Sequence, residues 1–181
     1  MTYEYLNEKN KKILELKNRR EVYELVKKYS GCHFRELERK SKLSTGVLNY
    51  HLDFLAKHDL IKQEKDGNNI RYFLTNIHFE NRKLLSILRQ ESIRKIILFI
   101  LTNNNCHHED IVRFVNLSPS TVSWHLKKLL RNDIVIQVKE GRKTTYKLLI
   151  HEDEIVRLLI FYKESFLDSL VNKTIEMWEI K

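Results

Sequence analysis

The sequence predicts a mainly α-helical protein with small β-hairpins, an α+β fold built from two copies of one module and a long C-terminal helix. Two observations predict this fold. A shift of 74 residues aligns 18–76 with 92–150 without a gap, and 15 of the 59 aligned pairs are identical. In each copy, apolar residues at helical spacing precede two β-rich runs around a glycine turn. Each copy is therefore expected to fold as one module.

The second copy is expected to begin with two helices. Isoleucines recur at helical spacing in residues 92–101 and predict the first helix, which ends at the asparagine run 103–105. Residues 109–115 predict a short second helix. The first copy repeats this order, with helices expected over 19–29 and 34–40.

A third helix is expected in each copy. Ser118 is a favourable N-cap and Pro119 a favourable first residue, so this helix of the second copy is predicted from Pro119 to about Arg131. Its counterpart in the first copy covers 45–58. In both helices, leucine and valine at i, i+4 and i+7 form one apolar stripe. The opposite face stays largely polar and can lie in a major groove.

Each copy ends in a predicted β-hairpin. In the second copy, runs over 134–139 and 144–149 flank a turn at Gly141. In the first copy the hairpin covers 61–74 and turns at Gly67. Three helices followed by a hairpin form a winged helix-turn-helix module, in which the third helix is the recognition helix and the hairpin is the wing.

The recognition-helix segments resemble those of known regulators. LSPSTVSWHLKKLLRNDIV, residues 117–135, closely resembles the corresponding segment of ArsR- and MarR-like regulators, and LSTGVLNYHLDFLAKHDLI, residues 43–61, is a looser example. Over residues 18–150 the chain resembles archaeal predicted transcriptional regulators with two helix-turn-helix units. The resemblance implies a sequence-specific, nucleoid-associated regulator that binds double-stranded DNA and has neither enzymatic activity nor a cofactor. Two cysteines are too few for a secreted disulfide framework, so a cytoplasmic protein is expected.

By the same resemblance, polar and basic residues of the recognition helices and wings face base edges or phosphates. In the second copy these residues are Ser118, Ser120, Thr121, Ser123, Trp124, Lys127, Lys128, Arg131, Arg142, Lys143 and Thr145. In the first copy they are Thr45, Asn49, Tyr50, Lys57, Asn68, Asn69 and Arg71. The two aromatic residues have equivalent positions, and either DNA contact or packing against the wing is open to them.

The charge balance favours a polyanionic partner. The chain has 33 Lys and Arg against 24 Asp and Glu, a net charge of +9. Residues 92–150 carry +6 and residues 18–76 carry +4, and Asp53 stands where the second copy has Lys127. We therefore expect the second module to supply most of the DNA affinity, while the first contributes register or protein contacts.

Two groups of cysteine and histidine, Cys32-His33 and Cys106-His107-His108, lie at equivalent positions, and Glu109 and Asp110 follow the second. Thiolate and imidazole are good zinc ligands, but adjacent Cys and His lack the usual ligand spacing. We expect small buried cysteines and no metal site, with metal or redox sensing as the alternative.

No catalytic residues are expected. His51 and His125 lie beside core leucines, which favours a structural or phosphate-contact role. No Gly-rich phosphate loop or nucleophile is evident. The longest apolar run is too short to cross a bilayer, so no membrane association is expected.

The remaining segments are expected to be helical. Residues 1–17 predict an N-terminal extension, and 77–91 predict a stiff connector whose helical pattern continues to residue 101, holding the modules at a fixed spacing. Residues 151–181 predict an amphipathic helix, about 40 Å long at 1.5 Å per residue. We expect this helix to form a homodimer, with packing onto its own chain as the alternative.

Two other functions remain open from the residues alone. One is an architectural protein that binds DNA with little sequence preference through phosphates and DNA deformability. The other is a protein-interaction adaptor made of tandem winged helices. The basic wing KEGRKTTYK, residues 139–147, and the polar outer face of the helix from 119 to 131 favour sequence-specific DNA binding.

Overall fold

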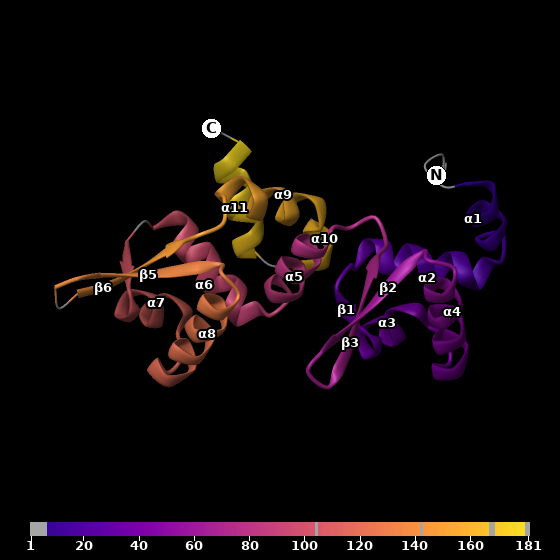
Figure 1. The fold of residues 1–181 in the computed structure, drawn as a ribbon, viewed down its shortest axis with the longest axis horizontal. Helices are drawn as coiled ribbons and strands as arrows, with labels where there is room; N and C mark the ends of the chain where they lie inside the picture. Colours follow the sequence, from indigo (N-terminus) through magenta and orange to yellow (C-terminus); the bar gives the residue numbers. More distant parts are fainter. Residues whose placement is uncertain (1–6, 104, 142, 167–168, 180–181) are drawn as a thin grey trace. The chain divides into compact units, whose positions relative to one another are not determined.

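The structure is a computed structural model that describes residues 7–103, 105–141, 143–166 and 169–179. Contacts divide the chain into two compact units, Met1–Ser86 and Ile87–Lys181. Figure 1 shows each unit as a group of helices with one β-hairpin that projects beyond them. In the described ranges, no helix is long and apolar enough to cross a membrane.

The first unit holds a module of helices and a three-stranded antiparallel sheet with the order β1-β3-β2. Helix α1 precedes the module and α5 follows it. The elements are α1 (Glu8–Ile13), α2 (Lys17–Lys28), β1 (Cys32–His33), α3 (Phe34–Ser41), α4 (Thr45–Lys57), β2 (Ile61–Asp66), β3 (Asn69–Leu74) and α5 (Phe79–Leu88).

The second unit repeats this module, with the sheet order β4-β6-β5, and adds helices at its C-terminal end. Its elements are α6 (Glu91–Thr102), β4 (Cys106–His107), α7 (His108–Val115), α8 (Pro119–Arg131), β5 (Val135–Glu140), β6 (Lys143–Leu148), α9 (Glu152–Phe161), α10 (Lys163–Phe166) and α11 (Ser169–Glu179).

The repeat seen in the sequence is confirmed element by element. Every helix and strand between Lys17 and Leu74 has a counterpart that begins and ends 74 residues later. Backbone positions with positive φ obey the same shift: Gly31 and Asn105, Lys42 and Asn116, Asp59 and Asp133, Gly67 and Gly141. The two modules therefore share their turns as well as their helices.

An aspartate ends both recognition helices. Asp59 and Asp133 have φ of 56°, a left-handed conformation in which Asp is enriched among non-glycine residues. The next residue closes the helix, because Leu60 N donates to Leu55 O at 3.0 Å and Ile134 N to Leu129 O at 3.1 Å. This turn leads the chain directly from the recognition helix into the wing.

The repeat extends one helix further than the sequence alignment predicts. Helices α5 and α9 both follow a wing, and the shift of 74 residues pairs Glu80 with Glu154 as well as two successive leucines in each helix. These leucines are buried in both units: Leu84, Leu85, Leu158 and Leu159. A helix behind the wing is therefore part of each module.

Each module has its own apolar core. The predicted stripes of the recognition helices are buried, with Leu48, Leu52 and Leu55 in α4 and Val122, Leu126 and Leu129 in α8. They are joined by apolar residues of the first helix and the sheet: Val22, Val26, Tyr72 and Phe73 in the first module, and Ile93, Ile96, Ile97 and Tyr146 in the second. Full burial of one such aliphatic side chain stabilises the fold by about 1.5–3 kcal/mol.

The predicted continuity of the connector helix to residue 101 is wrong. Helix α5 ends at Leu88, and Gln90 has an extended backbone before α6 begins at Glu91. Most apolar residues of both helices are buried, and they would not share one face of a straight helix. The guanidinium of Arg94, itself buried, donates to Leu88 O at 2.7 Å. This hydrogen bond satisfies a carbonyl at the end of α5, which has no partner within the helix.

The predicted long C-terminal helix is also wrong, because three short helices occupy the segment. Helix α9 ends before Tyr162, which has φ −110° and ψ 24°. Helix α11 contacts α9 and α6, so the segment folds back onto its own unit. This arrangement buries apolar residues from all three helices, including Ile155, Phe166 and Ile175. A single straight helix of about 40 Å would carry many of them beyond a module of this size.

Replacing Asp133 by valine is expected to destabilise the protein by about 1–3 kcal/mol, since a β-branched residue is strained at positive φ. Replacing it by glycine should cost less, because glycine adopts this conformation without strain. Urea unfolding of the two variants measures the difference. Equal stability of Asp133→Val and Asp133→Gly would show that the left-handed turn does not constrain this position.

Candidate nucleic-acid interface

The recognition helix of the second module begins as the sequence predicts. Ser118 Oγ accepts a hydrogen bond from Thr121 N at 3.2 Å, and Pro119 is the first helical residue. Ser118 Oγ also lies 3.0 Å from Ser120 Oγ and 2.7 Å from Thr121 Oγ1. Three hydroxyl groups thus gather at a helix N-terminus, where the helix dipole and unpaired N–H groups favour anions such as phosphates.

Four residues form one exposed face along α8: Ser120, Trp124, Lys127 and Arg131. Their spacing of four, three and four residues matches the helical period. The Trp124 side chain is 60% exposed, so the structure places most of it in solvent. We call these four residues the outer face of α8. It contains two cations and no carboxylate.

Two other predicted contact residues of α8 bind their own chain. Ser123 Oγ lies 2.9 Å from His108 Nε2. Lys128 Nζ donates to Gln90 Oε1 at 3.2 Å, at the start of α6. Both side chains are half-buried, as is that of Thr121. All three residues lie at the border of the outer face of α8, and their side chains stay partly exposed.

The second wing contributes further cations. Lys143 is exposed and Thr145 is half-buried, while Arg142 lies outside the described residues. Lys139, which sequence reasoning did not select as a contact, is also exposed and pairs with Thr144 across the hairpin. The basic run of residues 139–147 could have indicated this contact, but Lys139 was assigned to the strand and only residues of the turn and the second strand were selected.

The recognition helix of the first module has a different outer surface. Thr45 is exposed, and its hydroxyl donates to Glu38. Asp53 accepts from Asn49 Nδ2 at 3.0 Å and, on the other oxygen, from Gln63 Nε2 of the wing at 3.1 Å. Both bonds come from neutral amides, so the carboxylate charge stays exposed where α8 presents a lysine.

The other predicted residues of the first module separate into exposed and buried groups. Lys57 on α4 and the wing-turn residues Asn68 and Asn69 are exposed. Arg71 is only 7% exposed. Its Nε bonds Asp66 Oδ2 at 2.6 Å and its Nη1 donates to Gly31 O at 2.8 Å. Arg71 therefore holds the wing to the module, and we leave it out of the candidate interface.

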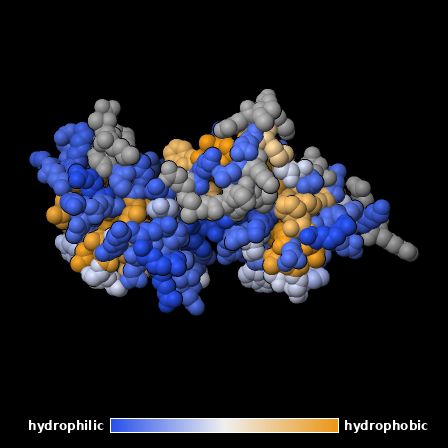
Figure 2. Space-filling view, turned by 180° about the vertical axis from the view of Figure 1, so that it is seen from behind, coloured by the Kyte–Doolittle hydropathy of each residue, from blue (hydrophilic) through white to orange (hydrophobic). Residues whose placement is uncertain are grey.

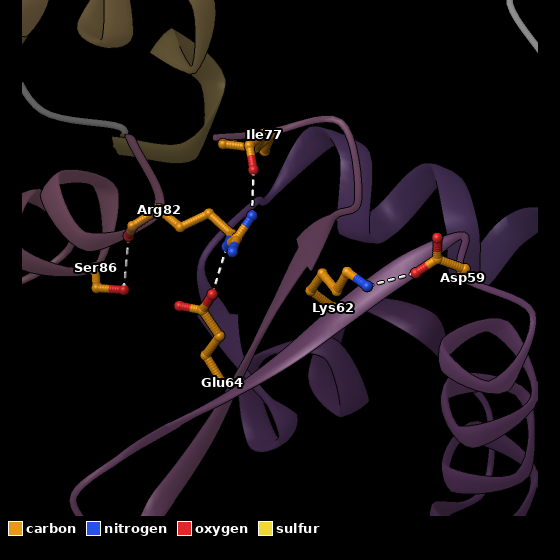
Figure 3. A network of polar contacts seen from close by, with 6 residues as sticks. All are labelled: Asp59, Lys62, Glu64, Ile77, Arg82 and Ser86. Carbon is orange, nitrogen blue, oxygen red and sulfur yellow. Dashed lines mark hydrogen bonds and ion pairs between the residues drawn. The ribbon is translucent and has the colours of Figure 1, made fainter. Parts of the chain in front are cut away.

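The wing of the first module is also tied to α5. The Arg82 side chain forms an ion pair with Glu64 of β2 and donates to the carbonyl of Ile77 (Figure 3). The equivalent positions in the second module are Val138 and Val156. This polar attachment is thus a property of the first module alone.

The paired aromatic and histidine residues are arranged alike in the two modules. Tyr50 is 58% exposed, close to the value for Trp124, and each ring meets the edge of the next residue, His51 or His125, at about 5 Å. Both histidines are buried. Burial is the main cause that lowers the pKa of each imidazole, followed by nearby Arg19 for His51 and Lys128 for His125. Neutral, buried rings favour the structural role over phosphate contact.

The two cysteines are buried in the short first strands of the sheets. Cys32 lies opposite Tyr72 and Cys106 opposite Tyr146. Burial raises the pKa of the Cys106 thiol to about 11, so it stays protonated at neutral pH. Among the described residues, no group of three or more His, Cys, Asp or Glu side chains could hold a metal ion.

Comparison with known proteins agrees with this geometry. Residues 16–85 match a family of N-terminal helix-turn-helix domains. Residues 81–136 match a family described as winged helix-turn-helix DNA-binding.

One curated relative is an uncharacterized HTH-type transcriptional regulator of Methanocaldococcus jannaschii, 33% identical over 135 residues. The match covers 75% of this chain and 34% of the relative, so the chain spans about a third of that protein's length. A crystal structure of a Corynebacterium diphtheriae protein aligns over 72% of this chain and 26% of its own, with 15% identity and a TM-score of 0.31.

The matched regions correspond to the structural repeat. The first family covers α2 to β3 and most of α5, and the second covers α6 to the start of β5. The chain therefore carries two helix-turn-helix domains in tandem, the second of which is similar to winged helix-turn-helix DNA-binding domains.

Proposed function

We propose that this protein is a sequence-specific transcriptional regulator that binds double-stranded DNA mainly through its second module. The outer face of α8 carries the proposal. It presents a hydroxyl, an indole and two cations on one side of a helix whose opposite side is buried. A helix of this kind fits the major groove, where hydroxyls can contact any base pair and cations can bind guanine or phosphate.

The wing supplies a second set of contacts. Lys139 and Lys143 are exposed on neighbouring strands of the β5–β6 hairpin. Lysines on a projecting hairpin can neutralise phosphates beside the groove that the recognition helix occupies. Together with Lys127 and Arg131, they contribute to the higher net charge of residues 92–150, +6 against +4 for residues 18–76.

The first module has a lesser role in this proposal. Its recognition helix offers Lys57, but Asp53 opposes phosphate approach and Arg71 is bound within the module. Its exposed Thr45, Tyr50, Asn68 and Asn69 can still contribute register or protein contacts.

Charge reversal tests this division of labour. Lys127→Glu should lower DNA affinity by about tenfold and reduce the slope of log K against log salt by about 1, since it removes a phosphate-neutralising cation. Lys57→Glu, at the end of α4, is the matched control and should change affinity less than threefold, about the size of a surface charge effect. Fluorescence anisotropy at several salt concentrations measures both. Equal losses would contradict the dominance of the second module.

Sequence specificity separates the proposal from its alternatives. The purified protein is titrated against genomic fragments, including its own upstream region, with excess competitor DNA at several salt concentrations. Tight binding to a few fragments is the expected result. Uniform, steeply salt-dependent binding would indicate an architectural protein. Absence of binding would favour the protein-interaction adaptor.

We further infer that the C-terminal helices form a homodimer contact. Ile160, Phe161 and Met177 are exposed on α9 and α11, and the Phe161 side chain is 79% exposed. On the face that Figure 2 displays, hydrophobic patches lie among mostly hydrophilic residues. Exposed apolar clusters mark interaction sites, and a two-fold dimer would match a palindromic DNA site.

Substitution of the most exposed of these three residues tests the dimer. Phe161→Asp should convert a dimer to a monomer, because a charge would be buried at the contact. Leu16→Asp, at an apolar residue of the first unit that is also exposed, is the control and should leave the dimer intact. Light scattering after size-exclusion chromatography gives the mass of each. A monomeric wild-type protein at micromolar concentration would refute the inference.

A further inference from the structure

Two consecutive histidines at the start of α7 contact the two elements proposed to meet DNA. His107 Nδ1 lies 2.9 Å from Thr144 O on β6, a strand of the wing. His108 Nε2 lies 2.9 Å from Ser123 Oγ on the recognition helix α8. The pair therefore links α7 to the wing and to the recognition helix at the same point. The sequence indicated these residues only as metal-ligand candidates, so this arrangement was missed.

The chemistry of the contacts defines the role of His107. A carbonyl oxygen only accepts, so His107 Nδ1 carries the hydrogen and donates it to Thr144. The backbone of His107 is fixed as well, because its N–H donates to Asp110 Oδ2 at 3.0 Å. This bond, followed by that from Arg113, lowers the pKa of the Asp110 carboxyl, so the acceptor stays charged.

Comparison with the first module shows that the fold does not require the second histidine. His33 matches His107, but Phe34 stands where the second module has His108, and its ring has no hydrogen-bonding group. The residue equivalent to Ser123 is Asn49, which binds Asp53 of its own helix. The same module thus folds with a different partner at this position of its recognition helix.

We propose that His107 and His108 brace the wing against the recognition helix, and that His108 is a positioning residue that sets the base-pair preference of the second module through Ser123. The proposal rests on the proposed DNA-binding function. A serine hydroxyl that rotates freely can donate or accept and tolerates several base edges. The hydrogen bond to His108 occupies one hydrogen-bonding direction of this hydroxyl. The directions left for a base edge are then fixed.

The test is a double-mutant cycle on the base preference. An operator is first selected by the wild-type chain from random double-stranded DNA, and every single base-pair substitution in it is then measured. His108→Phe installs the residue of the first module, and Ser123→Ala removes the hydroxyl. Each should reduce discrimination at one and the same base pair by roughly 3- to 10-fold, the size of one hydrogen bond. The double variant should lose no more than either single one.

Two further variants separate positioning from folding. His108→Gln keeps a side chain that can bond Ser123 and should restore most of the preference at that base pair. Phe34→Leu, at the equivalent position of the first module, should leave the whole profile unchanged. Uniform loss across all base pairs with a lowered unfolding temperature, a wild-type profile for His108→Phe, or the same local loss in Phe34→Leu would overturn the proposal.

The failure of the underlying function would appear separately. A wild-type chain that selects no sequence from the random DNA refutes sequence-specific binding itself. A wild-type chain that selects an operator while His108→Phe keeps the same preference refutes only the role of His108.

Discussion

Burial of one stripe on each recognition helix determines what the rest of the molecule can present. Val122, Leu126 and Leu129 are fixed in the core of the second module, and the helical period then directs Trp124 and Lys127 outward. The same constraint acts on α4. Because the stripe is purely apolar and well buried, its energy does not depend on which residues occupy the outer face. The outer faces were therefore free to diverge while the modules kept the same turns and strand register.

The sequence predicts the features that depend on local chemistry. The Ser118-Pro119 start of α8, the glycine turns of the wings and the apolar stripes are all local, and the structure contains them at the predicted places. The breaks at Gln90 and Tyr162 lie in segments without glycine or proline, so no local signal marks them. They follow from the need to bury more apolar residues than one face of a straight helix holds, which is a property of the whole unit.

The sequence also could not predict the direction in which long polar side chains point. Lys128 and Arg71 are basic residues of the kind that contacts DNA, yet their side chains form hydrogen bonds within the chain, to Gln90 and Asp66. Gln90 lies far from Lys128 in the sequence, and Asp66 faces Arg71 only once the hairpin has formed. The exposed Lys127 next to Lys128 shows that composition alone does not assign neighbouring cations to one surface. To assign DNA contacts on such helices, one must therefore also know which side of the helix each residue occupies and which hydrogen-bond acceptor lies nearest to it.

The residues expected to give DNA affinity and those expected to give base-pair preference occupy different parts of α8. The hydroxyl groups of Ser118, Ser120 and Thr121 lie at its N-terminal end, while Lys127 and Arg131 occupy its C-terminal half. In helix-turn-helix proteins the N-terminal part of the recognition helix meets base edges. Cations attract any phosphate, whereas a hydroxyl distinguishes base edges only if its direction is fixed. The histidine pair of α7 contacts the wing and Ser123, midway along α8, and it would provide this fixation where base contact is expected.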